Sequence, residues 1–285
     1  MIFVTGATGQ LAGLVIANLI KRYPAEKIVA GVRNIEKAAE LVKLGVKVRL
    51  ADYEKPELWS EAFRGVERVL IVSSSDLAKR YLHHRTVINA ARESQSVRFI
   101  AYTSMLNLEK STLRFTEDDR KTESDILKSG IPYAMLRNPW YIENYTMFAK
   151  EAMNTGVFYG AAGNGRLSGA TRSDLAEATA IILSAKEPVE NKVYELGGDS
   201  SFSLEEVVNE IIHISNRDIK YANIPLNDLI NRFIQIGFPN DVAELLSEAD
   251  NGVAKGELMC SSGDLSAILG RRTITLSQAI AKALE

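Results

Sequence analysis

A turn near the start of the chain carries two glycines at a spacing suited to binding phosphate groups. An apolar run at residues 2–5 leads into Thr5-Gly6-Ala7-Thr8-Gly9-Gln10-Leu11-Ala12, after which apolar residues recur at helical spacing. Gly6 meets the need for a residue without Cβ in a sharp turn, and Gly9 lets the backbone approach a pyrophosphate. The helix N-terminus offers its N–H groups to the same phosphates. A purely structural turn could use the same glycines, but this context favours a dinucleotide site, with Ala12 in place of a third glycine.

The residues that follow the second expected strand, residues 28–32, bear on which dinucleotide binds. Enzymes specific for NAD usually place an acid at the carboxyl end of this strand, where it binds the ribose 2′-hydroxyl. The only acid between Gln10 and Ile35 is Glu26, which precedes the strand and would lie at the opposite edge. Arg33 follows the strand, with Lys37 one turn later, and its guanidinium could bind a 2′-phosphate. NADPH is therefore favoured over NADH, although a solvated charged pair at a helix start would have the same sequence.

Two more loops follow expected strands and could contact the same cofactor. Asp52, after residues 46–50, would meet the edge of the adenine ring, but a plain turn would also accept it. After residues 69–72 come three small polar residues, which would let the backbone lie against the nicotinamide ribose or simply form a turn. These residues are Ser73, Ser74 and Ser75.

The usual proton donor of carbonyl-reducing dehydrogenases is missing from its expected place. That donor is a tyrosine with a lysine four positions later on one helix face. Only Tyr23 has such a partner, Lys27, and this pair flanks the entry of the second strand. The helix expected at residues 118–129 carries Asp119 and Glu123 instead. We therefore assign no catalytic acid from the sequence. The adjacent histidines of the preceding helix, at positions 83 and 84, are interpreted as surface or packing residues.

The elements that must position these residues alternate between strand and helix over the first 140 residues. Strands are expected at residues 2–5, 28–32, 46–50, 69–72, 97–103 and 133–136, as apolar runs buried on both faces. Helix-forming segments fill the gaps, which predicts a Rossmann-type doubly wound parallel sheet in the α/β class.

The regular alternation of strand and helix does not continue in the second half of the chain. Ser203-Leu204-Glu205-Glu206 is a capping box, and helical patterns predominate from there to the C-terminus. We predict an NAD(P)-binding Rossmann domain at 1–150, to which the chain returns at about 173–197, and a smaller α-rich C-terminal cap domain at 151–285 that forms the substrate cleft.

Composition narrows the possible partners of the protein. Of 285 residues 46% are apolar, and 34 basic residues nearly balance 36 acidic ones, so no basic face for nucleic acid is expected. The single cysteine, Cys260, excludes an internal disulfide, and no metal-ligand constellation is present. No apolar run approaches the roughly 18–20 residues that span a bilayer, and the N-terminus lacks a signal-peptide pattern. A cytoplasmic protein without membrane insertion is expected, while the oligomeric state stays open.

Motifs along nearly the whole chain resemble the NmrA-like branch of atypical short-chain dehydrogenases, and within it the bacterial type 2 NAD(P)H:quinone oxidoreductases. The motifs lie at residues 5–11, 32–34, 73–75, 101–104, 136–141, 143–145, 160–163 and 170–172. The resemblance implies NADPH contacts at Gly6, Ala7, Thr8, Gly9, Gln10, Leu11, Arg33, Ser73, Ser74, Ser75, Arg137, Asn138, Pro139, Trp140, Tyr141 and Arg172. It also implies a quinone cleft lined by Tyr141, Asn144 and Phe238, and a return segment under the cofactor at Thr171 and Arg172.

This chain departs from the family in two places: Asp119 stands where family members carry a histidine, and Pro139 where they tend to have glycine. The resemblance implies an NADPH-dependent oxidoreductase that transfers hydride to a quinone by stacking. A non-catalytic NADP(H)-binding regulator and a reductase of another conjugated small molecule are the alternatives.

Overall fold

The computed structural model describes residues 1–187 and 190–285, which form two compact units. Unit 1 comprises Met1–Met105, Glu117–Arg137 and Leu175–Tyr194. Unit 2 comprises Leu106–Thr116, Asn138–Asp174 and Glu195–Glu285. Residues 106–116 and 138–150, which the sequence grouped with the first domain, thus lie in unit 2.

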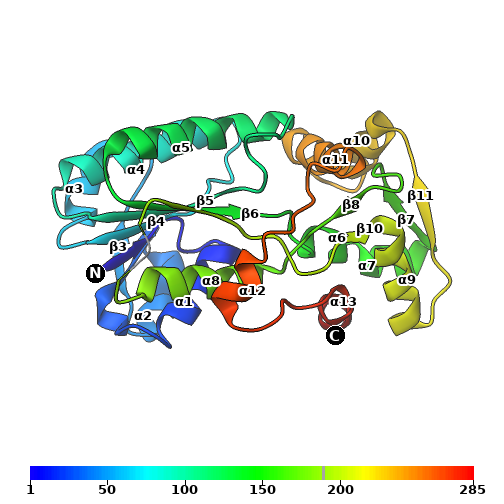
Figure 1. Cartoon of the computed structure of the whole chain (residues 1–285), viewed down its shortest axis with the longest axis horizontal. Helices are drawn as coiled ribbons and strands as arrows, with labels where there is room; N and C mark the ends of the chain where they lie inside the picture. The colour runs from blue at the N-terminus through cyan, green and yellow to red at the C-terminus, as the bar shows by residue number, and fades with distance from the viewer. Residues whose placement is uncertain (188–189) are drawn as a thin grey trace. The chain divides into compact units, whose positions relative to one another are not determined.

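Unit 1 is built on a seven-stranded sheet in the order β3-β2-β1-β4-β5-β6-β9 (Figure 1). Its strands are β1 (Ile2–Val4), β2 (Ile28–Val32), β3 (Lys47–Leu50), β4 (Arg68–Ile71), β5 (Phe99–Met105), β6 (Tyr133–Asn138) and β9 (Lys192–Glu195). The pairings from β3 through β2, β1 and β4 to β5 are all parallel, with Ile2 opposite both Ile28 and Arg68. Because the first six strands have the Rossmann order, the predicted fold class is confirmed.

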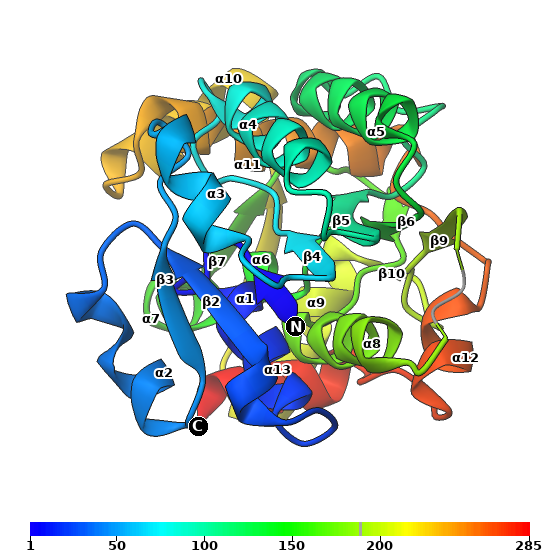
Figure 2. The ribbon, with the colours of Figure 1, turned by 90° about the vertical axis from the view of Figure 1, so that its left-hand side faces the viewer.

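Helices cover both faces of this sheet, as Figure 2 shows. On one face lie α1 (Gln10–Leu19), α2 (Ala39–Lys43) and α8 (Arg172–Ser184); on the other lie α3 (Trp59–Ala62), α4 (Arg80–Glu93) and α5 (Glu117–Ser129). Short 3₁₀ turns occupy Ala25–Lys27, Glu36–Ala38, Pro56–Leu58 and Arg114–Thr116. An aromatic cluster anchors the core, with the Phe3 and Phe63 rings edge to face at 5.0 Å between centroids. This burial fixes the sheet and thereby the loops at its carboxyl edge.

β3 corrects one expectation, because its residues are exposed or half-buried and not buried on both faces. The strand lies at the edge of the sheet, and within residues 1–187 and 190–285 it pairs only with β2. Its charged residues suit that place: the Arg49 guanidinium donates to the carbonyl oxygens of Ala62 and Arg64, at 2.8 Å each.

Unit 2 contains short strands and most of the C-terminal helices. Its elements are α6 (Glu143–Thr146), α7 (Ala149–Thr155), β7 (Val157–Gly160), β8 (Arg166–Leu167), β10 (Phe202–Ser203), α9 (Leu204–Ser215), β11 (Lys220–Asn223), α10 (Leu226–Gln235), α11 (Asn240–Ala254), α12 (Asp264–Leu269) and α13 (Leu276–Leu284). β11 pairs parallel with β7, and β10 antiparallel with β8. The capping box of Ser203 and Glu206 is confirmed at the start of α9. Among the described residues, no helix is long and apolar enough to cross a membrane.

Candidate active site

The turn between β1 and α1 has the geometry of a phosphate cradle. Gly6 has a φ of +56°, in the left-handed region, and its carbonyl oxygen accepts from the Gly9 N–H at 2.8 Å. Gly9 is the N-cap of α1, which has no capping side chain and no acid in its first turn. A Cβ at Gly9 would lie 3.1 Å from the Gly6 oxygen. The first-turn N–H groups are thus left for a ligand, and these residues fit a dinucleotide pyrophosphate.

Arg33 is the first residue after β2, and its side chain is exposed. The neighbouring Asn34 is used locally, because its side-chain oxygen accepts from the Glu36 N–H at 2.8 Å. Lys37 is also exposed. Burial raises the pKa of Tyr53. A hydrogen bond from Thr5 and the positive charge of Arg33 oppose this shift. Because Arg33 directly follows β2, it lies at the carboxyl end of that strand, and its contact with a 2′-phosphate stays a prediction.

In the loop after β3, the side chains of Asp52 and Tyr53 make different contacts. The Asp52 carboxylate accepts from the Glu54 N–H at 3.1 Å, which is the turn role that the sequence left open. The Tyr53 hydroxyl instead lies 3.5 Å from the position of a Cβ at Gly6, beside the phosphate turn. The Tyr53 ring stacks on Trp59, with 5.8 Å between centroids. Tyr53 was not predicted at this site, although it is an aromatic residue directly after the expected adenine contact Asp52.

The serine loop after β4 is held by side chains of neighbouring elements. The Ser73 N–H donates to the Thr103 hydroxyl at 2.8 Å, and the Ser74 N–H donates to His84 Nε2 at 2.9 Å. His84 Nδ1 lies 2.9 Å from the Thr122 hydroxyl. Burial lowers the pKa of His84 to about 3, so the ring is neutral and serves as a structural brace. Its interpretation as a packing residue is thus correct.

The acids of α5 are buried in hydrogen-bonded pairs. The Tyr102 hydroxyl donates to the Asp119 carboxylate. Burial raises the pKa of Asp119 to about 6, and the charge of Arg80 opposes this shift. Glu123 accepts from Ser104 at 2.6 Å. Both acids thus bind side chains of β5, Asp119 through Tyr102 and Glu123 through Ser104.

Arg137 forms the other half of the Glu123 pair. Its Nε and Nη2 atoms donate to Glu123 at 3.0 and 2.7 Å, and the residue is only 5% exposed. A buried bidentate pair of this kind is costly to break. The guanidinium is thus committed to Glu123, and a contact between Arg137 and the cofactor stays a prediction.

In unit 2, the structure brings Tyr141, Asn144 and Arg172 together. The Arg172 guanidinium lies over the Tyr141 ring, 4.5 Å from its centroid, and Nη2 donates to the Asn144 side chain at 2.8 Å. The Arg172 backbone N–H donates to Glu143 at 2.8 Å. Asn138 donates to the Tyr141 hydroxyl at 3.5 Å. Arg172 therefore contacts both cleft candidates, Asn144 on α6 and Tyr141 just before that helix.

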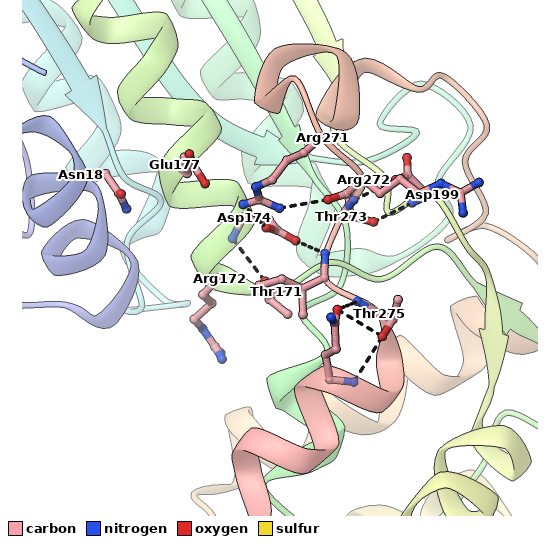
Figure 3. Close-up of polar contacts among 12 residues, drawn as sticks. Asn18, Thr171, Arg172, Asp174, Glu177, Asp199, Arg271, Arg272, Thr273 and Thr275 are labelled. Carbon is pink, nitrogen blue, oxygen red and sulfur yellow. Dashed lines mark hydrogen bonds and ion pairs between the residues drawn. The ribbon is translucent and has the colours of Figure 1, made fainter. Parts of the chain in front are cut away.

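The start of α8 is anchored by a buried acid, as Figure 3 shows. The Thr171 hydroxyl accepts from the Asp174 N–H at 3.2 Å. Asp174 is fully buried and accepts from Arg271 at 2.8 Å and from the Ile274 N–H at 2.7 Å. These bonds fix the segment that carries Arg172.

The remaining predicted residues of unit 2 lie in aromatic packing. Trp140, which follows Pro139, is 9% exposed, and its ring lies 6.0 Å from that of Phe115. Phe238 packs against Phe148 and Phe233, with centroids 6.0 and 5.8 Å away. A role for Phe238 at the substrate remains a prediction. The part of the chain that the structure describes holds no cluster of residues able to bind a metal ion.

Asp250 is a buried carboxylate that ties α11 to α6. It accepts from the Tyr145 hydroxyl at 3.0 Å and from the Ala161 N–H at 2.8 Å. Burial raises its pKa to about 6, and these two hydrogen bonds oppose the shift. Because Tyr145 follows Asn144 on α6, the contact also fixes the cleft candidates.

This pKa predicts a pH-dependent stability. Between the ordinary value of 3.8 and about 6, the folded protein binds the Asp250 proton more tightly than the unfolded chain does. The free energy of unfolding should therefore fall as pH rises through this window. Asp250→Asn should flatten that fall, as measured by urea denaturation at about pH 4 and about pH 7. Asp241→Asn, an exposed site on the same helix, is the control and should keep the wild-type pH dependence. An unchanged fall in Asp250→Asn would contradict the assignment.

The strand order, the glycine turn and the uncapped start of α1 together define a dinucleotide-binding Rossmann protein. Residues 1–259 match the NmrA-like family. The chain belongs to that family.

Its relatives include enzymes of known structure. Quinone oxidoreductase 2 of Escherichia coli (strain K12) is 42% identical over 280 residues, 98% of this chain and 97% of that protein. The structure of the NADPH-dependent quinone oxidoreductase QOR2 of Escherichia coli with NADPH matches all of both chains, with a TM-score of 0.96 and 42% identity. Citrobacter sp. triphenylmethane reductase with NADP(H) matches 99% of this chain and 100% of that one, with a TM-score of 0.94 and 33% identity. The dinucleotides in both structures agree with the class of site derived from the glycine turn.

Proposed function

We propose that this protein is an NADPH-dependent oxidoreductase that transfers hydride to a quinone. The observation that carries the proposal is the uncapped N-terminus of α1 behind Gly6 and Gly9, where a Cβ would crowd the Gly6 oxygen at 3.1 Å. Such a site receives the pyrophosphate of a dinucleotide. The name of the Escherichia coli relative, 42% identical over 98% of this chain, supports a quinone as the substrate.

The preference for NADPH over NADH is part of this proposal and depends on Arg33. Its exposed guanidinium follows β2 at the position where NAD-specific enzymes usually carry an acid. A guanidinium matches the geometry of a phosphate and offers charge-assisted hydrogen bonds. The adjacent Asn34 is engaged with the Glu36 N–H, which leaves the 2′-phosphate to Arg33.

Reduction of a quinone depends less on a proton donor in the protein than reduction of an isolated carbonyl does. When bound, NADPH supplies the hydride. The hydroquinonate that results spreads its negative charge over the ring, so a dedicated protein acid is less important. The task of the side chains is then alignment of two flat rings. We assign this to Tyr141, Asn144 and Phe238, with Arg172 holding the first two in place at 4.5 and 2.8 Å.

The direct test is the consumption of NADPH by the purified protein with 1,4-benzoquinone, followed by absorbance. Oxidation should depend on protein and quinone together and should be faster with NADPH than with NADH. Samples without protein and without quinone are the controls. Tight NADPH binding with no oxidation of NADPH by benzoquinone or a naphthoquinone would refute the proposed reductase activity. It would favour a non-catalytic NADP(H)-binding regulator.

The proposed mechanism also predicts which side chains matter for turnover. Asp119→Asn should leave kcat/KM within about tenfold of wild type, about 1.4 kcal/mol in barrier, because Asp119 is bonded to Tyr102 in the core. Tyr141→Ala should cost more than about tenfold, since it removes a face that aligns the rings. The measurement is kcat/KM for one quinone, with thermal melts to check folding.

The opposite pattern would overturn the stacking mechanism. A loss of about a thousandfold in Asp119→Asn, with Tyr141→Ala near wild type, would identify the carboxyl group as the working acid.

A further inference from the structure

His83 on α4 has a buried ring nitrogen that the fold leaves unsatisfied. The residue is 6% exposed, and its Nδ1 lies 2.9 Å from the Ser74 hydroxyl. Its Nε2 is buried and has no hydrogen-bond partner among the described residues. Buried polar atoms in folded proteins are nearly always paired, so this nitrogen needs an explanation. The same helix shows the contrast, because both ring nitrogens of the adjacent His84 are paired.

The hydrogen bonds around Ser74 are compatible with a proton on Nε2. The Ser74 hydroxyl oxygen accepts from the Asp76 N–H at 3.3 Å, so its own proton can point to His83 Nδ1. In a neutral imidazole with Nδ1 as acceptor, Nε2 is the N–H donor. Burial lowers the pKa of His83, which favours this neutral form. In this tautomer the unpaired atom is a hydrogen-bond donor.

The position of the ring ties this donor to the cofactor edge of the sheet. His83 stacks on Tyr53 with 4.8 Å between centroids and 14° between planes. The Tyr53 hydroxyl is in turn 3.5 Å from the Cβ position of Gly6 in the phosphate turn. The charge of Arg33 acts on His83 as well. Ligands of open α/β sheets bind outside the carboxyl ends of the strands, and the loops after β2, β3 and β4 meet here.

We propose that His83 binds the cofactor by donating its Nε2–H to an acceptor atom in the adenosine half of NADPH. The inference rests on the proposed function, because it takes NADPH as the ligand. It explains why the fold leaves one histidine donor unpaired beside the phosphate turn while it satisfies the next one. Tyr53 acts as a positioning residue, since its ring holds the imidazole plane.

Two substitutions separate the hydrogen bond from the packing of the ring. His83→Phe keeps a flat ring against Tyr53 and removes the N–H. We expect it to weaken NADPH by about 3- to 10-fold, as for one lost neutral hydrogen bond. His83→Gln retains a neutral side-chain N–H and should stay within about twofold of wild type. Leu82→Ala, at a 50% exposed neighbour on α4, is the matched control and should bind NADPH as wild type does.

Calorimetric titration with NADPH and with its fragment adenosine 2′,5′-bisphosphate provides the readout, alongside thermal melts of the unliganded proteins. The proposal predicts equal fold-losses for the two ligands in His83→Phe. The Tm of the unliganded variant checks folding only, because His83→Phe removes the unpaired Nε2 and also the Nδ1 partner of the Ser74 hydroxyl. A merely structural role would leave the affinity of the folded protein unchanged.

Three results would overturn the proposal. Wild-type affinity in His83→Phe would mean that Nε2 bonds only to water. A loss for NADPH without a loss for the bisphosphate would place the contact outside the adenosine half. If His83→Phe does not fold, imidazole nitrogen NMR of the wild type decides, because the Nε2 resonance should shift when NADPH is added, and an unchanged resonance would overturn the proposal. Failure of the wild type to bind either ligand would instead refute the proposed function itself.

Discussion

Gly9→Val is expected to abolish dinucleotide binding while leaving the fold intact. Even a Cβ at this position would lie 3.1 Å from the Gly6 carbonyl oxygen, and the branched methyls would extend into the space of the pyrophosphate. We expect NADPH binding to weaken by at least about 100-fold, or about 2.7 kcal/mol. Binding is measured by calorimetric titration. The Tm of the unliganded protein should change by no more than about 2–4 °C, because no core residue changes.

Gly13 offers a matched control one turn further along the same helix. A Cβ at Gly13 would have nothing within 4 Å. Gly13→Ala should therefore bind NADPH normally and raise the Tm, since alanine stabilises a helix by about 0.5–1 kcal/mol relative to glycine. Normal NADPH binding by Gly9→Val would show that the turn between β1 and α1 is not the phosphate site.

Arg33→Ala is expected to weaken NADPH far more than NADH. One charge-assisted contact with a phosphate contributes about 1.5–3 kcal/mol, so the dissociation constant for NADPH should rise by about 10- to 150-fold. The two cofactors differ only in the 2′-phosphate, and titration of both against wild type and mutant isolates that group. The ratio of the two losses is the result that matters.

Lys37→Ala is the companion variant, because Lys37 is exposed and lies one turn beyond Arg33. It should cost no more than about threefold for NADPH, since a solvated ammonium makes a weaker contact than a guanidinium fork. Equal losses of NADPH and NADH in Arg33→Ala would remove this residue from the 2′-phosphate. A larger loss of NADPH affinity in Lys37→Ala than in Arg33→Ala would assign the 2′-phosphate contact to Lys37.

The glycine turn and the Rossmann order could be predicted because their requirements are local. Gly6 takes a left-handed φ and Gly9 caps a helix, and both roles are set by residues within one strand and one helix. Arg33 was equally accessible to prediction, since it directly follows the apolar run of β2. Patterns of this kind survive folding because tertiary contacts reinforce what the local sequence already prefers.

The side-chain pairs could not be predicted, since they join separate elements. The family resemblance implies a cofactor contact at Arg137, but nothing in the sequence predicted that its guanidinium binds Glu123 on α5 at 2.7 Å. That pairing depends on how α5 packs on the sheet, which no local pattern encodes. The stack of His83 on Tyr53 likewise joins α4 to the loop after β3.

The sequence also did not predict the two-residue strands β8 and β10 or the exposure of the edge strand β3. β8 and β10 have two residues each and pair with one another, Phe202 opposite Leu167 and Ser203 opposite Arg166. Two residues carry no period that a sequence can display. The exposure of β3 follows from its place at the sheet edge, and its charged residues Lys47 and Arg49 were a signal that its apolar neighbours outweighed.

The course of the chain through unit 1 has a consequence for synthesis on the ribosome. The strand β9 and most of α8 belong to Leu175–Tyr194, which leaves the ribosome long after β1 to β6 have been made. Arg68 on β4 donates to the carbonyl oxygens of Leu183 and Ala185 at 2.6 Å each, so an early strand obtains its partners from this late segment. A nascent chain that ends near residue 150 would expose one edge of β6 and the apolar face that α8 covers. Unit 1 can therefore close only after residue 194 has emerged, and a truncated Rossmann fragment of this protein should aggregate.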